Sequence, residues 1–124
     1  QEIYRQKLPD ELPKGKYENT SNVVPGNNTF YQLRNGNQGG VMLNYDITRK
    51  KWNIVFQTDY RLNSLSIDKD SSIWVSCYMG LWNIDAGLIN KQYIPNLKLV
   101  DGRTIYTEVS TLYNDNQGVM WLGT

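Results

Sequence analysis

The sequence contains no histidine and only one cysteine among its 124 residues. Without histidine, the chain cannot build a Ser-His-Asp or Cys-His catalytic arrangement, a usual zinc site, or the phospho-accepting residue of a histidine kinase. Cys77 cannot form an internal disulfide, and we expect it to be a small buried hydrophobe. The glycine-rich run 36–40 lacks the spacing and the Lys-Ser/Thr of a phosphate loop. We therefore expect no catalytic residue, no metal site and no cofactor.

Long apolar runs and strong net charge are also missing. No segment approaches the ~18 apolar residues that a membrane-spanning helix needs. The net charge is +1, which provides no long-range attraction to nucleic acid or anionic lipid. The basic run 49–51 is typical of a solvated turn. The chain begins with Gln1 rather than methionine or a signal peptide, which is compatible with a mature exported protein.

The residues that are abundant favour an all-β fold. The chain has nine tyrosines and four tryptophans, and short segments such as 65–68 alternate apolar and polar residues. No helical pattern persists, because the best candidate, around residues 9–17, is interrupted by Pro13 and Gly15. We interpret residues 1–29 as a loop-rich lead-in.

An aspartate, a polar turn and a tryptophan strand occur together twice. Trp74 and Trp121 are 47 residues apart, and aligning them also places Leu65 on Leu112, Asp68 on Asp115 and Val75 on Leu122. A repeat of this length indicates a β-propeller blade or another repeat architecture. Asp115 can accept hydrogen bonds from amides of its turn, and Gly118 can adopt positive φ. Ser71 replaces this glycine in the first copy, so that turn must use a different backbone or tolerate strain.

The pattern continues beyond each tryptophan strand. The runs 80–85 and 40–46 each consist of a glycine, an apolar strand and a closing aspartate, and strands at 91–94 and 51–57 follow them. Four short strands joined by tight turns make one up-and-down blade. We predict a partial blade at about 30–60, a full blade at about 61–99 and a partial blade at about 100–124. The residues expected to build the repeat are Asp68, Trp74, Gly80, Leu81, Asp85, Asp115, Gly118 and Trp121.

These residues resemble the two-component regulator propeller repeat of the extracytoplasmic sensor regions of hybrid histidine kinases, especially in Bacteroidetes. The likeness is carried by Asp-x-x-Gly-x-x-Trp-Leu-Gly-Thr at 115–124 and by Gly80, Leu81 and Asp85. It is weaker at Ser71, Ser76 and Cys77, and weaker still near Tyr31 in the first blade. The resemblance covers about residues 30–124. It implies seven-bladed propellers, followed by a β-sandwich, a membrane span and a kinase, and thus a periplasmic location.

A complete propeller needs at least about four blades. The chain stops at Thr124, where the next two strands of its last blade should begin. We therefore expect an incomplete propeller, either a fragment or a chain that completes its sheet with a partner. The remaining blades, or self-association through open sheet edges, would supply that partner. We expect Trp74 and Trp121 to pack between blades, whereas the roles of Trp52 and Trp82 are left open.

Propeller topology indicates where a ligand would bind. The connections between strands two and three, and those from each outer strand to the next blade, lie on one face. Here they are 34–38, 78–79, 58–62 and 101–107. Amide, carboxylate, guanidinium and aromatic groups together suit an oligosaccharide. The candidate ligand-binding residues are Arg34, Asn37, Asp59, Tyr60, Arg61, Tyr78 and Arg103.

Three functions remain open on these observations. The leading hypothesis is the periplasmic ligand-sensing propeller of a hybrid two-component regulator, with any kinase activity elsewhere in the protein. The second is a fragment of a propeller lyase or glycosidase, whose missing blades would supply the catalytic groups. Asp68 and Asp70 are two residues apart in a turn, and we expect them to cap backbone amides instead of flanking a scissile bond. The third is a propeller scaffold that binds proteins.

Overall fold

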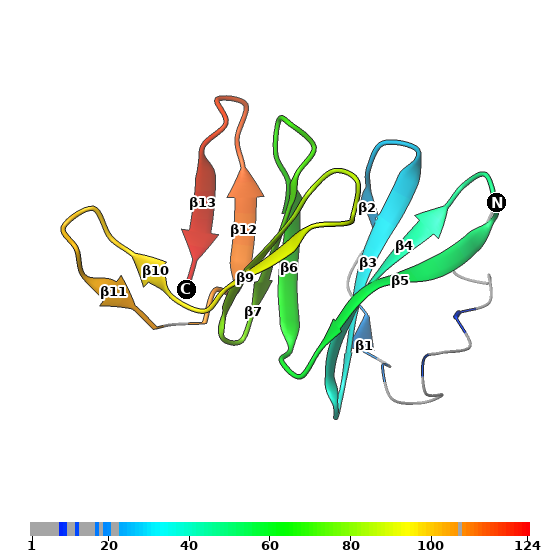
Figure 1. Cartoon of the computed structure of the whole chain (residues 1–124), viewed down its shortest axis with the longest axis horizontal. Helices are drawn as coiled ribbons and strands as arrows, with labels where there is room; N and C mark the ends of the chain where they lie inside the picture. Colours follow the sequence, from blue (N-terminus) through cyan, green and yellow to red (C-terminus); the bar gives the residue numbers. More distant parts are fainter. Residues whose placement is uncertain (1–7, 10–11, 13–16, 18, 21–22, 107) are drawn as a thin grey trace. The chain divides into compact units, whose positions relative to one another are not determined.

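The computed structural model describes residues 8–9, 12, 17, 19–20, 23–106 and 108–124. All regular secondary structure in this part of the chain is β-strand, which confirms the predicted all-β fold (Figure 1). None of the residues described belongs to a helix that is long and apolar enough to cross a membrane. The chain divides into two compact units, residues 1–62 and 63–124. Most of the expected lead-in lies outside the described residues.

The first unit is built on an antiparallel meander of three eight-residue strands. These are β3 (Thr29–Gly36), β4 (Gly39–Asp46) and β5 (Lys51–Thr58). Two short strands, β1 (Asn19–Thr20) and β2 (Val24–Pro25), pair with the other edge of β3. Parts of the expected lead-in thus join the sheet, because β3 would otherwise expose an unpaired edge, and an edge position tolerates the proline.

One face of this first sheet has an apolar core. Val41, Leu43 and Tyr45 of β4 and Trp52 of β5 are buried there together with Leu12 from the N-terminal segment. The rings of Tyr45 and Trp52 meet edge to face, with centroids 5.2 Å apart and planes at 62°. Such aromatic pairs stabilise a sheet beyond their area burial. Trp52, whose role the sequence left open, is therefore a core residue.

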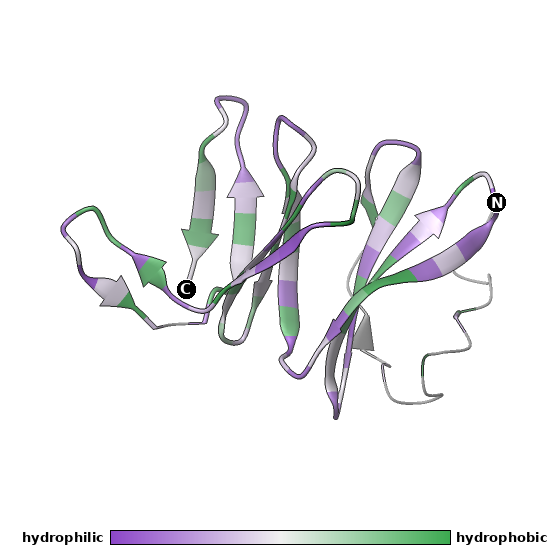
Figure 2. Ribbon diagram, in the orientation of Figure 1, coloured by the Kyte–Doolittle hydropathy of each residue, from purple (hydrophilic) through white to green (hydrophobic). Residues whose placement is uncertain are grey.

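The second unit contains a four-stranded antiparallel sheet and two hairpins. The sheet order is β6 (Leu62–Ile67), β7 (Ile73–Cys77), β8 (Gly80–Ile84) and β9 (Lys91–Ile94), which is the up-and-down arrangement of a propeller blade. The hairpins are β10 (Leu97–Lys98) with β11 (Thr104–Ile105), and β12 (Thr111–Asn114) with β13 (Met120–Gly123). Figure 2 shows hydrophilic turns and alternating bands along strands such as β12, as expected for half-buried strands.

The β12–β13 hairpin packs on one face of the four-stranded sheet. Leu81, Val109 and Leu112 are buried between them, and Trp74 and Met120 pack against this cluster. Polar contacts fix the register: the Leu112 amide donates to Ser64 Oγ at 3.2 Å, and Asn114 Nδ2 donates to Ser66 Oγ at 2.8 Å. The ring of Trp74 therefore lies between two sheets of the repeat.

The opposite face of the β12–β13 hairpin is open. Tyr113 and Trp121 are cross-strand partners there, and they are 60% and 61% exposed. Trp121 aligns with Trp74, and Tyr113 aligns with Ser66. The expected packing of Trp121 between blades is not found in this chain, because no described residue covers that face.

The two copies of the repeat share one turn. The Trp74 Nε1 donates to Asp68 Oδ2 at 3.1 Å, and the Trp121 Nε1 donates to Asp115 Oδ2 at 3.0 Å. In both turns the aspartate amide bonds to the carbonyl four residues later, at 3.0 Å. The aspartate carbonyl in turn accepts from the amide three residues later, at 3.0 Å in the first copy and 3.2 Å in the second. The two copies, 47 residues apart in the sequence, therefore form the same hydrogen-bonded unit.

Ser71 keeps the backbone of the glycine that it replaces. Its φ is 67°, against 82° for Gly118 at the aligned position. A left-handed backbone costs a non-glycine residue about 1–2 kcal/mol. The first copy therefore tolerates strain instead of adopting a different turn, because the hydrogen bonds to Asp68 require this conformation.

A second shared feature is the glycine that opens the third strand of each sheet. Gly39 and Gly80 have φ values of 113° and 100°. A Cβ atom on Gly80 would lie 2.1 Å from the carbonyl oxygen of Ile94, and one on Gly39 would lie 2.1 Å from that of Thr58. Each turn can therefore pack directly against the end of the outermost strand only if this residue is glycine.

We expect Gly80→Ala to lower the free energy of unfolding by about 3 kcal/mol or more, because backbone strain and a clash with Ile94 act together. Gly102→Ala is the matched control, since Gly102 also has positive φ (91°) but nothing lies within 4 Å of an added Cβ. The control should cost about 1–2 kcal/mol from strain alone. Urea denaturation of both variants measures the difference, and equal losses would contradict the close approach at Gly80.

The turn aspartates are held in their charged form. Burial disfavours the carboxylate of Asp68, but hydrogen bonds from Asp70, Ser72 and Trp74 outweigh it and lower its pKa. The hydrogen bond from Trp121, followed by that from the Val119 amide, lowers the pKa of Asp115. A depressed carboxyl pKa contributes stability above the unfolded value of about 3.9, and this contribution is lost as the pH falls through the folded value.

Acid should therefore destabilise the chain partly through Asp68. We expect the free energy of unfolding to fall as the pH drops below about 4, and to fall less steeply in Asp68→Asn, which cannot ionise. The free energy of unfolding of the variant should still depend on pH, because the pKa values of Asp85 and Asp115 are also lowered. Urea titrations between pH 7 and pH 2 test this, and identical slopes would show that the Asp68 carboxylate contributes nothing.

Candidate functional site

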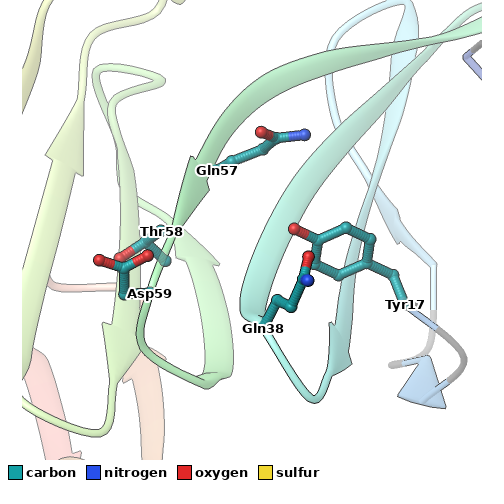
Figure 3. A pocket seen from close by; sticks show the side chains of 5 residues that line it. All are labelled: Tyr17, Gln38, Gln57, Thr58 and Asp59. Carbon is teal, nitrogen blue, oxygen red and sulfur yellow. The ribbon is translucent and has the colours of Figure 1, made fainter. Parts of the chain in front are cut away.

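A polar hollow of about 570 Å³ lies at one end of the first sheet (Figure 3). The antiparallel register pairs Gly40 with Thr58, so the β3–β4 turn and the end of β5 meet at this end. The volume is within the range of about 300–1,000 Å³ that is usual for small-molecule sites. The lining side chains are those of Tyr17, Gln38, Gln57, Thr58 and Asp59.

The lining groups have complementary chemistry. Figure 3 draws the side chains that line the hollow, with the side chain of Gln57 projecting from β5. The two primary amides can each donate and accept hydrogen bonds, and the Asp59 carboxylate can accept them. An aromatic ring beside such groups can stack on an apolar face. This combination suits a ligand with several hydroxyl groups.

Arg34 supports the hollow from outside its lining. Its Nε donates to the main-chain carbonyl of Tyr17 at 2.9 Å. Burial lowers the pKa of this guanidinium group. Arg34, which we predicted as a ligand contact, thus holds the backbone at Tyr17 beside the hollow.

The β5–β6 connection is fixed by one asparagine. Asn35 Nδ2 donates to the Leu62 carbonyl at 2.7 Å, and the Leu62 amide donates to Asn35 Oδ1 at 2.8 Å. Gly40 makes room for this arrangement, because a Cβ atom there would lie 2.7 Å from Asn35 Oδ1 and from Leu62 Cγ. Within the connection, the Tyr60 amide bonds to Thr58 Oγ1 at 3.3 Å. The backbone that carries Asp59 is therefore held at both ends.

The first unit brings together two of the four predicted loops, 34–38 and 58–62. Asp59 lines the hollow, Asn37 lies at the exposed tip of the turn that carries Gln38, and Tyr60 and Arg61 are exposed in the connection. Sequence reasoning missed Tyr17, Gln38 and Gln57 as lining residues. Gln38 was inside a predicted loop, but no motif pointed to a residue of the lead-in.

The other two predicted loops are in the second unit. Tyr78 is exposed in the β7–β8 turn. Arg103 is in the β10–β11 turn, where its Nε donates to Asp101 Oδ2 at 2.9 Å, and Thr107 lies outside the described residues. Binding by these residues remains a prediction.

A second hollow, of about 410 Å³, lies beside the β8–β9 turn in the second unit. Asp85 lines it, but its Oδ1 already accepts hydrogen bonds from the amides of Ile89 at 2.9 Å and Asn90 at 3.2 Å. The bond from the Ile89 amide is the main cause of the lowered pKa of Asp85. Asp85 therefore closes a turn. Among the described residues, no group of three or more histidine, cysteine or acidic side chains could hold a metal ion.

The sequence of the second Asp–turn–Trp unit matches a known family. The family described as "Two component regulator propeller" matches residues 105–124, which include the second Asp–turn–Trp unit. This part of the chain is therefore similar to a two component regulator propeller repeat. This confirms the predicted resemblance at Asp115, Gly118 and Trp121. A search of curated proteins finds no match.

Solved structures support the propeller fold over most of the chain. The extracellular domain described as that of a hybrid two component system, BT4673 of B. thetaiotaomicron, matches with a TM-score of 0.76 and 13% identity over 95% of this chain. A second structure of the BT4673 extracellular domain, described as a one component system, matches with a TM-score of 0.73, again with 13% identity over 95% of this chain. The chain spans 16% of the length of each of these structures. The likeness shows that these sheets have the fold of propeller-type blades.

We expect Asn35→Ala to release the β5–β6 connection. The variant loses both hydrogen bonds to the buried Leu62 backbone and should cost about 1–3 kcal/mol of stability. Amide hydrogen exchange should increase at residues 59–62. Asn37→Ala, two residues away and exposed, should change neither the stability nor the exchange rate. If exchange at 59–62 is the same in both variants, Asn35 does not fix the connection.

Proposed function

We propose that this chain is part of the extracytoplasmic ligand-sensing propeller of a hybrid two-component regulator. The match of residues 105–124 to the regulator propeller family supports the assignment, and so does the fold shared with an extracellular domain described in those terms. In a periplasmic sensor of this kind, ligand binding would bias the relation between sensor modules and so control a kinase elsewhere in the protein. Such control requires different affinity for the two states.

The ligand that we propose is an oligosaccharide. The observation that carries this is the polar hollow of the first unit, which combines two amides, a hydroxyl, a carboxylate and the ring of Tyr17. Sugars present hydroxyl groups that need paired donors and acceptors and a C–H face that stacks on an aromatic ring. The hollow offers both, on a backbone that Asn35 and Arg34 hold in place.

We propose that the chain has no catalytic role of its own. A carboxyl group that acts as a general acid near neutral pH needs a raised pKa. The described aspartates with shifted pKa values, Asp68, Asp85 and Asp115, are all shifted downward by hydrogen bonds within their own turns. They are built to stay ionised and to hold the backbone. These features favour a sensor over the lyase or glycosidase alternative.

The proposed partner of the second unit is a further sheet of the same repeat. Trp74 is covered by the β12–β13 hairpin, whereas the aligned Trp121 and its neighbour Tyr113 are exposed. The next two strands of the same blade would pair with the free edge of β13, and a sheet of the next blade would bury that apolar face.

The sequence of the complete gene tests these proposals together. We expect further Asp-x-x-Gly-x-x-Trp units after Thr124, followed by a membrane span and a histidine kinase. A gene that encodes further units but no membrane span and no histidine kinase would support the propeller and contradict the role in a hybrid two-component regulator. A gene that lacks further units would also reject the partner proposed for Trp121.

A further inference from the structure

We infer that the hollow of the first unit binds a short neutral segment of a glycan and discriminates against acidic glycans. This inference rests on the proposed function, and it adds the class of sugar and the residues that select it. It follows from the charge, the size and the rigidity of the lining, which is formed by Tyr17, Gln38, Gln57, Thr58 and Asp59.

Charge is the first argument. Among the five lining residues, Asp59 is the one that carries a charge at neutral pH, and that charge is negative. Carboxylate or sulfate groups of an acidic glycan would meet a like charge at close range, and they would leave their hydration shell to do so. The Asp59 carboxylate instead accepts hydrogen bonds from neutral hydroxyl groups, and charge-assisted bonds of this kind are strong.

The nearby basic groups do not offset this charge from within the lining. The Arg34 Nε is committed to the main-chain carbonyl of Tyr17 at 2.9 Å. Arg61 is exposed in the β5–β6 connection, and its side chain is not among the lining groups. A site for acidic glycans would place a guanidinium or ammonium group toward the ligand.

The neutral lining groups supply the recognition. Gln38 and Gln57 reach the hollow from different elements, the β3–β4 turn and β5, so they can bond hydroxyl groups on two edges of one ring. Each amide offers both donors and an acceptor, which matches the dual character of a hydroxyl group. Tyr17 also lines the hollow and offers a ring face for stacking (Figure 3).

Rigidity makes this selectivity effective. Asn35 pins Leu62 through both its amide and its carbonyl, and Gly39 and Gly40 allow the connection to lie against the β3–β4 turn without space for a Cβ atom. The backbone that carries Asp59 is therefore fixed beside the hollow, and an incoming anion cannot displace it at low cost. A fixed unfavourable group is an effective means of rejecting a wrong ligand.

The test is calorimetric titration of the full chain with two sets of hexasaccharides. The neutral set is xylohexaose, cellohexaose, mannohexaose and maltohexaose, and the acidic set is hexagalacturonate and a chondroitin sulfate hexasaccharide. We expect at least one neutral sugar to bind, and acidic sugars to bind at least about tenfold more weakly. Asp59→Asn keeps the shape of the side chain but removes its charge. This variant should reduce the difference in affinity between neutral and acidic sugars several-fold.

Variants of the two amides locate the site. Gln38→Ala and Gln57→Ala should each weaken binding of the neutral sugar by about fivefold or more. Gln92→Ala, in the second hollow, is the matched control and should leave binding unchanged. Circular dichroism and thermal melts confirm that each variant is folded.

The outcomes separate the two proposals. Acidic sugars that bind as tightly as neutral ones, or more tightly, would overturn the inference and leave oligosaccharide sensing intact. Neutral binding that is insensitive to both Gln38→Ala and Gln57→Ala would remove the site from this hollow. Failure of every sugar in both sets to bind would reject oligosaccharide sensing by this chain, and the inference with it.

Discussion

The hydrogen bond from a tryptophan indole to an aspartate six residues earlier organises each copy of the repeat. Asp68 and Asp115 use one carboxylate oxygen for the indole and the other for amides of the turn, so one side chain joins the turn to the strand that follows it. The bond orients the large ring, and in the first copy the ring packs on Leu81, Val109 and Leu112. Packing between sheets therefore depends on the geometry of a turn. This is also why Ser71 adopts a backbone that glycine would adopt without strain.

The candidate site depends on a different constraint, the close approach of backbone segments at the end of the first sheet. Gly39 and Gly40 allow the β5–β6 connection to lie directly against the β3–β4 turn, and Asn35 then bonds both polar groups of Leu62. Asparagine can do this because its side chain carries the same donor and acceptor as a peptide group. The result is a fixed backbone that carries Asp59 beside Gln38 and Gln57. The residues that line the hollow are thus different from the aspartates and tryptophans that build the two turns of the repeat.

Much of the fold could be predicted from the sequence because its signals are local. The apolar runs within 40–46 and 80–85, the polar turns and the spacing of Trp74 and Trp121 depend on near neighbours in the chain, and the structure has strands at these positions. The candidate site was harder to predict from the sequence. Loops 34–38 and 58–62 were expected on one face from topology, and they do meet, but Tyr17 lies in a segment without a motif. The expected burial of Trp121 depends on contacts with another sheet of the repeat, and the local sequence pattern around Trp121 carries no information about such contacts.

By itself, the sequence determined the class of the protein: an all-β repeat with Asp–turn–Trp units, no histidine chemistry and no strong charge. These follow from composition and short-range spacing, which need no knowledge of long-range contacts. The tertiary structure alone decided which polar groups share a hollow, that Arg34 supports the backbone at Tyr17, and that Asn35 fixes Leu62 from 27 residues away. Such contacts form only when the strands pair in the correct register. Register depends on which faces of the strands are buried, and no single segment determines that.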